Sequence, residues 1–357
     1  MCRVSVLAVA LLWHAAALAA AGQAAPGPAA SGEPSGQEQR EDALEVFQAP
    51  ARKDMKVPYY PRSRRQDGSE GWVQLHFMID PEGQPYEIVV TDSTGDNAFE
   101  ESAVRAVERS TFEPAALDGR PIDAGYNLKI SFALEGEGAP GARPSFVRDY
   151  RRAIAAIESG DREQAEERLG ELEVGNLYED AYLNVARYWY FKSWGDRHQR
   201  LAALRRAVAH EQEQKYLPEQ VFRWALLTRF ALEVDLQDFG AALDTARLLR
   251  SQNLTGEQTA ALEATVAEIR TLASDDRSFA VTGYTGADTS WYITLLKRHF
   301  YIDQVEGEIA EIKLRCDRDY VLFRYDPTME YQVSEQQGTC HMEVVGDPGT
   351  TFRLVQS

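Results

Sequence analysis

Two cysteines near the C-terminal end, Cys316 and Cys340, are the residues whose type and placement most directly suggest chemistry. They are the cysteines that remain if an N-terminal export signal carrying Cys2 is removed. An even pair of cysteines in an exported chain is typically a disulfide. The neighbouring His341 offers a metal site as the alternative, but two cysteines this far apart, without a second close pair, have poor spacing for zinc. The sequence therefore favours a disulfide.

The residue patterns that usually carry catalysis do not occur in this sequence. None of its six histidines belongs to an HExxH pair, and no Gly-x-Ser-x-Gly motif is present. The run Gly346 to Thr350 lacks the lysine and the following helix that a phosphate-binding loop requires. The sequence therefore predicts no catalytic residue, metal or cofactor and no enzymatic activity. A hydrolase with an unrecognised C-terminal site is the remaining enzymatic alternative.

The length and charge of the chain limit the classes of protein it can belong to. Its 357 residues include 56 acidic and 38 basic ones, giving a net charge of −18. A chain of this length is expected to form several domains. The negative charge opposes contact with phosphate backbones, so nucleic acid is not expected as a partner.

The N-terminal segment indicates export. An apolar stretch from Val4 to Ala21 ends in Ala-x-Ala, which is the layout of a secretory signal over residues 1–21. An uncleaved membrane anchor is the alternative, because the stretch approaches the length that crosses a bilayer. Residues 22–49 are rich in Ala, Pro, Gly, Ser, Glu and Gln and predict a disordered linker. A periplasmic location follows, with membrane contact only if the N-terminal segment is retained.

Residues 50–135 contain a compact pattern of strands and one helix. Trp72 to Ile79 alternates as a half-buried strand, the turn Asp80 to Gly83 follows, and Tyr86 to Asp92 forms the returning strand. Asn97 resembles a helix cap, with apolar residues at near-helical spacing after it. A further strand is predicted at Tyr126 to Leu134. The predicted order is strand, strand, helix, strand.

The segment from Pro58 to Leu134 resembles the C-terminal domain of the TonB energy transducers. The resemblance rests on separately placed motif positions spread over the whole segment, including Tyr-Pro, Gly-Trp-Val, Phe-Glu-Pro-Ala and Asp-Gly elements. The motif residues are Pro58, Tyr60, Pro61, Gly71, Val73, Gly83, Phe112, Pro114, Gly119 and Phe132.

The resemblance implies an α+β domain that captures a short peptide of an outer-membrane receptor by adding it as an extra strand. An edge strand offers unpaired N–H and C=O groups to such a peptide, and Tyr126 to Leu134 is the strand we expect to do so. Envelope proteins are the implied partners. If the rest of the protein covers this edge, the alternative is a structural or envelope-assembly adaptor without peptide capture. The expected partner-binding residues are Tyr126, Leu128, Lys129, Ile130 and Phe132.

Two departures from the family pattern argue against coupling to a proton-driven motor. The membrane helix of the family carries a Ser and a His one turn apart, whereas His14 has Ala10 and Leu18 at those spacings. The linker is also short and poor in proline, so it cannot span far as an extended arm. We therefore expect a periplasmic interaction module that assists TonB-dependent transport across the outer membrane.

The remainder of the chain predicts two further domains, which make the fold class multidomain α+β. Residues 145–275 are rich in helix formers, with breaks at Gly160-Asp161 and Gly195-Asp196. This spacing resembles a degenerate array of about three tetratricopeptide-like helical hairpins. Residues 279–357 contain turn signals and six short β-rich runs, which predict a small all-β sandwich or barrel that includes the disulfide. The runs are Trp291 to Leu296, Phe300 to Val305, Ile309 to Leu314, Tyr320 to Tyr325, His341 to Val345 and Thr351 to Val355.

Overall fold

The computed structural model describes residues 46–134, 141–209, 216–286 and 289–357. The predicted signal or anchor (1–21) and the predicted linker as far as residue 45 lie outside the described residues. The described residues fall within one compact unit, Glu45–Ser357. Within the described ranges, no helix is long and apolar enough to cross a membrane.

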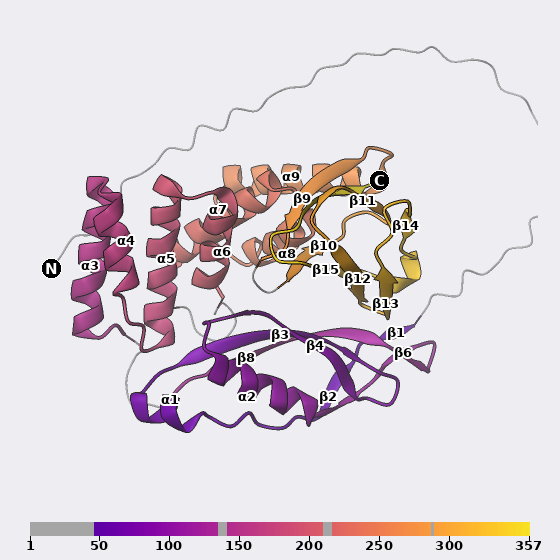
Figure 1. Ribbon diagram of the computed structural model, residues 1–357, viewed down its shortest axis with the longest axis horizontal. Coiled ribbons are helices and arrows are strands. Elements are labelled where there is room, and N and C mark those ends of the chain that lie inside the picture. Colours follow the sequence, from indigo (N-terminus) through magenta and orange to yellow (C-terminus); the bar gives the residue numbers. More distant parts are fainter. Residues whose placement is uncertain (1–45, 135–140, 210–215, 287–288) are drawn as a thin grey trace, which may run out of the picture. The chain divides into compact units, whose positions relative to one another are not determined.

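A three-stranded antiparallel sheet and one helix form the N-terminal part of this unit (Figure 1). The sheet has the order β4-β3-β8, with β3 at Gly71–Ile79, β4 at Pro85–Ser93 and β8 at Ala124–Phe132. Helix α2, Asn97–Glu108, lies across one face. Alternate residues of β3, Val73 among them, pack against α2 and form one apolar core. The predicted order of these four elements is therefore present in the structure.

Short elements that the sequence did not predict complete this part of the fold. β1 (Phe47–Gln48) pairs with β6 (Ala115–Leu117), which pairs with β7 (Arg120–Ile122). β2 (Ala51–Asp54) pairs with β5 (Thr111–Glu113), and α1 (Arg62–Asp67) precedes β3. Residues 47–48, which we had assigned to the end of the linker, are thus part of a sheet.

The start of α2 differs from the expectation by one residue. Asp96, not Asn97, is the N-cap: its backbone is extended and its side chain accepts a hydrogen bond from the N–H of Ala98. Both residue types cap helices well, so the sequence alone did not decide between neighbours. Similarly, β8 begins two residues before Tyr126 and ends at Phe132.

The middle of the chain is helical. Helix pairs follow one another as α3 (Pro144–Ser159) with α4 (Arg162–Gly170), and α5 (Leu177–Trp194) with α6 (Arg197–Ala207). The pair α7 (Glu219–Asp235) and α8 (Phe239–Leu249) precedes α9 (Gly256–Ser274). The predicted breaks are helix ends: Gly160 is left-handed at the end of α3, and Asp161 and Asp196 cap α4 and α6. The likeness to tetratricopeptide repeats remains a prediction.

Two four-stranded antiparallel sheets share one apolar core in the C-terminal part. One sheet has the order β10-β15-β12-β13 and the other β14-β11-β16-β9. The sequence predicted six of these strands and missed β9 and β14. The strands are β9 Phe279–Tyr284, β10 Ser290–Thr294, β11 His299–Glu306, β12 Ile309–Cys316, β13 Asp319–Arg324, β14 Tyr331–Gln332, β15 Cys340–Gly346 and β16 Thr351–Gln356, with the short helix η1 at Glu335–Gln337.

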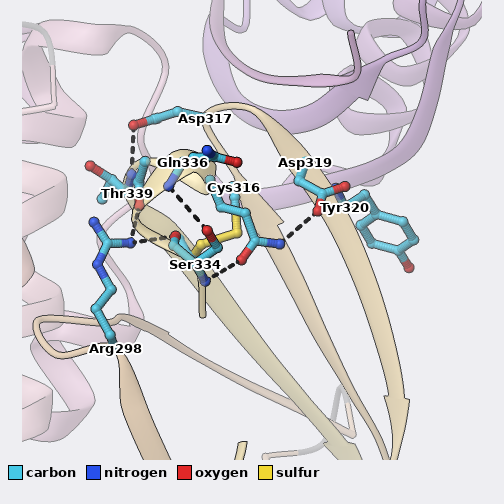
Figure 2. The surroundings of a disulfide bond; sticks show 11 residues. Arg298, Cys316, Asp317, Asp319, Tyr320, Ser334, Gln336 and Thr339 are labelled. Carbon is cyan, nitrogen blue, oxygen red and sulfur yellow. Dashed lines mark hydrogen bonds between the residues drawn. A yellow bond between two sulfur atoms is a disulfide. The ribbon is translucent and has the colours of Figure 1, made fainter. Parts of the chain in front are cut away.

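Cys316 and Cys340 form the predicted disulfide between β12 and β15. The two strands are not consecutive in the chain, and the cysteines are direct partners in their register. Figure 2 shows the polar groups around it: the N–H of Thr339 donates to the carboxylate of Asp317, 2.7 Å away. Arg298 donates to the carbonyl oxygen of Ser334. No group of residues that could hold a metal ion occurs in the described part of the chain.

Candidate functional site

The outer edge of β8 is the candidate site. Within the described residues, β8 pairs along one side only, with β3, in an uninterrupted register from Ala124 to Phe132. Nine residues in regular pairing leave alternate backbone N–H and C=O groups directed away from β3. A strand with this geometry can accept another extended chain by forming a second ladder.

The opposite edge of the same sheet, β4, is a poorer acceptor. Its pairing with β3 shifts register twice, between Gln74 and Leu75 and between His76 and Met78. Glu87 lies at such an irregularity with a left-handed φ of 49°. Bulges of this kind bend a strand and interrupt the row of groups available to a partner. The sheet therefore offers one regular edge.

The structure places most of the predicted partner-binding side chains in the core instead of on the surface. Leu128, Ile130 and Phe132 are buried against α2, and Tyr126 packs on the same core. These side chains hold β8 in position, so a partner on this edge would contact the backbone of β8.

Asn127, Lys129 and Ser131 of β8 have side chains on the other face of the sheet. Asn127 is exposed, and its side-chain oxygen accepts a hydrogen bond from His76 Nδ1 at 3.0 Å. The Lys129 ammonium lies 5.0 Å from the ring centroid of Trp72. Lys129 was among the predicted partner-binding residues, whereas Asn127 was not. The alternation of polar residues with Leu128 and Ile130 would have identified it.

Two glycines of the TonB-like motif occupy places where a side chain would not fit. A Cβ on Gly83 would lie 2.1 Å from the carbonyl oxygen of Phe112, and Gly83 has a left-handed φ of 82°. A Cβ on Gly71 would lie 2.5 Å from the ring of Phe99. Gly83 therefore lets the β3–β4 turn approach the backbone of Phe112, and Gly71 lets the start of β3 approach the ring of Phe99 on α2.

The remaining motif residues also shape the fold. The ring of Tyr60 meets the rings of Phe99 and Phe132 edge to face, at 5.6 and 5.9 Å between centroids. The Tyr60 hydroxyl donates to the carbonyl oxygen of Ser69, and burial raises its pKa to about 12. The other motif residues lie in the core, at turns or at element ends: Val73 and Phe112 buried, Pro58 and Pro114 half-buried, Pro61 before α1, and Gly119 in the β6–β7 turn at φ 77°.

The sheet face opposite α2 is covered by other parts of the unit. The indole N–H of Trp72 donates to the carboxylate of Asp180 at the start of α5, over 3.3 Å. The carboxylate of Asp92 accepts from Arg206 of α6 at 3.0 Å. A Cβ on Gly125 would lie 2.9 Å from the carbonyl oxygen of Cys316. The helices and the C-terminal sheets therefore close this face, while β8 keeps its one-sided pairing.

Charged and titratable groups are buried where the C-terminal sheet meets this face. His76 and His341 lie 5.0 Å apart between ring centroids, and Arg315 bridges Glu343 at 2.7 Å and Glu87 at 3.1 Å. Burial, His341 and Arg315 lower the pKa of His76 to about 3. Burial also lowers the pKa of His341. Both imidazoles are therefore neutral at pH 7 and serve the packing of the two sheets.

A cavity of about 1120 Å³ lies beside the end of α9 and the start of β11. Its lining includes Asp275, Lys297 and His299. The Lys297 ammonium is buried and donates to the carbonyl oxygen of Asp275 at 2.5 Å, where the C-terminal end of α9 favours a cation. This contact gives Lys297 a structural role.

Comparisons with known proteins agree with the resemblance found in the sequence. Residues 56–134 match the family model of the Gram-negative bacterial TonB protein C-terminal domain. Protein TonB of Vibrio cholerae is 35% identical over 79 residues, which are 22% of this chain and 32% of that protein. Protein TonB2 of Pseudomonas aeruginosa is 36% identical over 78 residues, 22% of this chain and 29% of that protein. The match thus spans about a third of the length of these relatives.

Two solved structures are also similar to part of this chain. The solution NMR structure of the Pseudomonas aeruginosa TonB C-terminal domain has 25% identity and a TM-score of 0.22, over 28% of this chain and 95% of that one. The TonB2 protein of Vibrio anguillarum has 25% identity and a TM-score of 0.20, over 31% of this chain and all of that one.

Proposed function

Starting from the match of residues 56–134 to the TonB C-terminal family, we propose that this protein is a periplasmic interaction module of the cell envelope. It captures an extended peptide of another envelope protein along β8 and so assists transport across the outer membrane. A short segment of an outer-membrane receptor is the partner class that the resemblance to the TonB family implies.

The observation that carries this proposal is the one-sided pairing of β8. Its nine residues keep a continuous register with β3, and its side chains Leu128, Ile130 and Phe132 are fixed in the core. The backbone of β8 is therefore held straight before a peptide arrives. Less conformational entropy is lost on binding when the receiving strand is already ordered.

The side chains beside the edge bear on which peptides would fit. An added strand would place alternate side chains next to Asn127 and Lys129 on the face away from α2. The other side chains would extend the apolar face that α2 covers. A peptide that alternates polar or acidic residues with apolar ones suits both faces.

A second candidate function is structural. The face of the sheet opposite α2 contacts α5, α6 and the C-terminal sheets, as Trp72, Asp92 and Gly125 show. A TonB-like sheet packed in this way could act as a scaffold in envelope assembly without capturing a peptide. The two functions differ in whether the outer edge of β8 is used.

Proline substitution in β8 distinguishes the two functions. Lys129→Pro and Asn127→Pro each place a ring on β8 and remove one N–H, while Thr91→Pro does the same on the bulged edge strand β4. We expect full-length wild-type protein and the Thr91→Pro variant to select the same peptides from a random display library. The β8 variants should bind them about tenfold more weakly, because one or more backbone hydrogen bonds are lost.

Thermal unfolding of each variant provides the control for folding. Asn127 and Lys129 are two residues apart, so their N–H groups point to the same side of β8. A β8 variant that keeps a melting temperature near that of the wild type has lost no bond to β3 and is informative. Unchanged peptide selection by that variant would contradict capture along β8 and favour the scaffold function.

A further inference from the structure

A strip of basic and apolar side chains follows α2 in a protein that is otherwise strongly acidic. Between Ala51 and Arg65 there are six Lys or Arg residues and one Asp, in a chain with 56 acidic and 38 basic residues. The segment therefore has a charge opposite in sign to that of the whole molecule. With such an asymmetry, a negatively charged surface attracts the basic side of the protein and repels the rest, so the protein can approach it in one orientation only.

Specific contacts hold this strip in place against α2. The N–H of Lys56 donates to the hydroxyl of Ser110, just after the C-terminal end of the helix, at 2.9 Å. The carbonyl oxygen of Tyr59 accepts from Ser102, in the middle of the helix, at 2.5 Å. The ring of Tyr60 then reaches Phe99 in the first turn. The strip thus runs antiparallel to α2 as an extended, anchored segment.

Large apolar side chains point outward between these anchors. Val57 is 90% exposed and Tyr59 is 50% exposed, although each lies next to residues that are fixed in place. An apolar side chain this exposed on an ordered segment gains free energy when a partner removes it from water.

Three of the basic residues are available to such a partner. Within the described ranges, Arg52, Lys53 and Arg62 are exposed and form no ion pair or hydrogen bond through their side chains. The other three cations have partners: Lys56 pairs with Asp54, and Arg64 with Asp96 at 2.5 Å, while Arg65 lies over the ring of Tyr60 at 5.3 Å.

We propose that the strip from Arg52 to Arg62 docks on the surface of a bilayer rich in anionic phospholipid. Exposed Tyr and Val side chains enter the headgroup region, where the aromatic hydroxyl stays hydrated, and Lys and Arg extend to the phosphates. An acidic polypeptide fits less well, because Val57 would need an apolar pocket on it. The exposed residues of this surface do not belong to β8, and docking through them needs no N-terminal anchor.

Vesicle binding by the full-length protein tests the proposal. Co-sedimentation is compared for vesicles of phosphatidylcholine alone and of equal parts phosphatidylcholine and phosphatidylglycerol. Residues 4–21 contain no Asp, Glu, Lys or Arg. The ratio of the two partition coefficients therefore reports the electrostatic part of binding by the whole chain, and the variants below assign the share of the strip. We expect a clear preference for the anionic vesicles, which weakens as the salt concentration rises.

The main variant combines Arg52→Glu, Lys53→Glu and Arg62→Glu. We expect it to lose at least about tenfold of the binding to anionic vesicles, since each basic residue near the membrane surface contributes severalfold. A matched variant makes the same change in net charge at exposed arginines of α3, α4 and α9 and should bind like the wild type. It combines Arg151→Glu, Arg162→Glu and Arg270→Glu.

A second variant, Val57→Ser with Tyr59→Ser, leaves the charge unchanged. It should bind the anionic vesicles more weakly than the wild type does, with the same dependence on salt concentration. This variant tests the strip even if the triple variant fails to fold. Equal binding to both kinds of vesicle, or equal losses in the main and matched variants, would overturn the proposal. Strip-dependent binding to poly-glutamate without binding to vesicles would overturn it in favour of an acidic polypeptide.

Discussion

Gly83 occupies a position that a residue with a side chain can enter only by moving the backbone. We expect Gly83→Ala to lower the free energy of unfolding by about 2–4 kcal/mol, because the new Cβ would meet the Phe112 carbonyl oxygen at 2.1 Å. The matched control is Gly95→Ala, where φ is 84° and no atom lies within 4 Å of the added Cβ. In that variant the free energy of unfolding should fall by only about 1 kcal/mol, the cost of holding a residue with a side chain in the left-handed conformation. Equal losses in urea unfolding would contradict the close approach.

His76 predicts how stability depends on pH. Its pKa falls from an ordinary 6.5 to about 3 in the folded protein, because burial and the nearby His341 and Arg315 disfavour the cation. Between these values the unfolded chain binds more protons, so this contribution is complete above pH 6.5 and is lost as pH falls toward 3. Asp180 acts in the opposite direction, since burial raises its pKa from 3.8 to about 6.

The His76→Gln variant isolates the histidine contribution. We expect its free energy of unfolding to vary less steeply between pH 4 and 6, by up to about 1 kcal/mol per pH unit. Denaturant unfolding at several pH values measures the slope. An unchanged slope would show that His76 is not buried in its neutral form.

At the level of elements, the disulfide joins the end of β12 to the start of β15. It closes a loop with a sequence separation of 24 between direct partners on β12 and β15. Replacing both cysteines by alanine should cost about 3 kcal/mol of stability, mainly in β9–β16. Thermal unfolding with and without reductant checks this expectation. The double variant should be insensitive to reductant, and a wild type that is equally insensitive would argue against the bridge.

Elements with strong local patterns were predictable from the sequence. The hairpin of β3 and β4, helix α2, strand β8 and the breaks at Gly160 and Gly195 follow from alternation, turn residues and helix caps. β1, β2, β5, β6, β7 and β14 were missed because strands of two to four residues are too short to show a period. β1, β2 and β14 pair with strands that lie far along the chain, whereas β6 and β7 form a short hairpin with each other.

The candidate site was predictable in its strand but not in its side chains. β8 was identified as the edge from the family resemblance. Four of the five side chains assigned to the partner, Leu128 among them, face α2, although strict alternation would have separated them from Asn127 and Lys129. No local pattern predicted that Asp180 and Cys316 cover the opposite face of the sheet. They lie more than a hundred positions along the chain from Trp72 and Gly125, the residues that they contact.

In the molecule as a whole, the TonB-like sheet has one face under α2 and the other against the helices and the C-terminal sheets. The contacts on that second face are largely polar, such as Asp92 with Arg206 and Glu87 with Arg315. Polar interfaces of this kind hold domains together without burying a continuous apolar core. Within the described residues, the outer edge of β8 pairs with no other strand and keeps a regular register.

Amide hydrogen exchange along β8 in the full-length protein tests the central claim most directly. The exchange rates are measured with and without a peptide selected by the wild-type protein. Capture by strand addition predicts that alternate amides between Ala124 and Phe132 slow in the complex, because outward N–H groups become hydrogen-bonded. The amides of β3 should not change. Slower exchange confined to the helices or the C-terminal sheets, with β8 unaffected, would contradict the account.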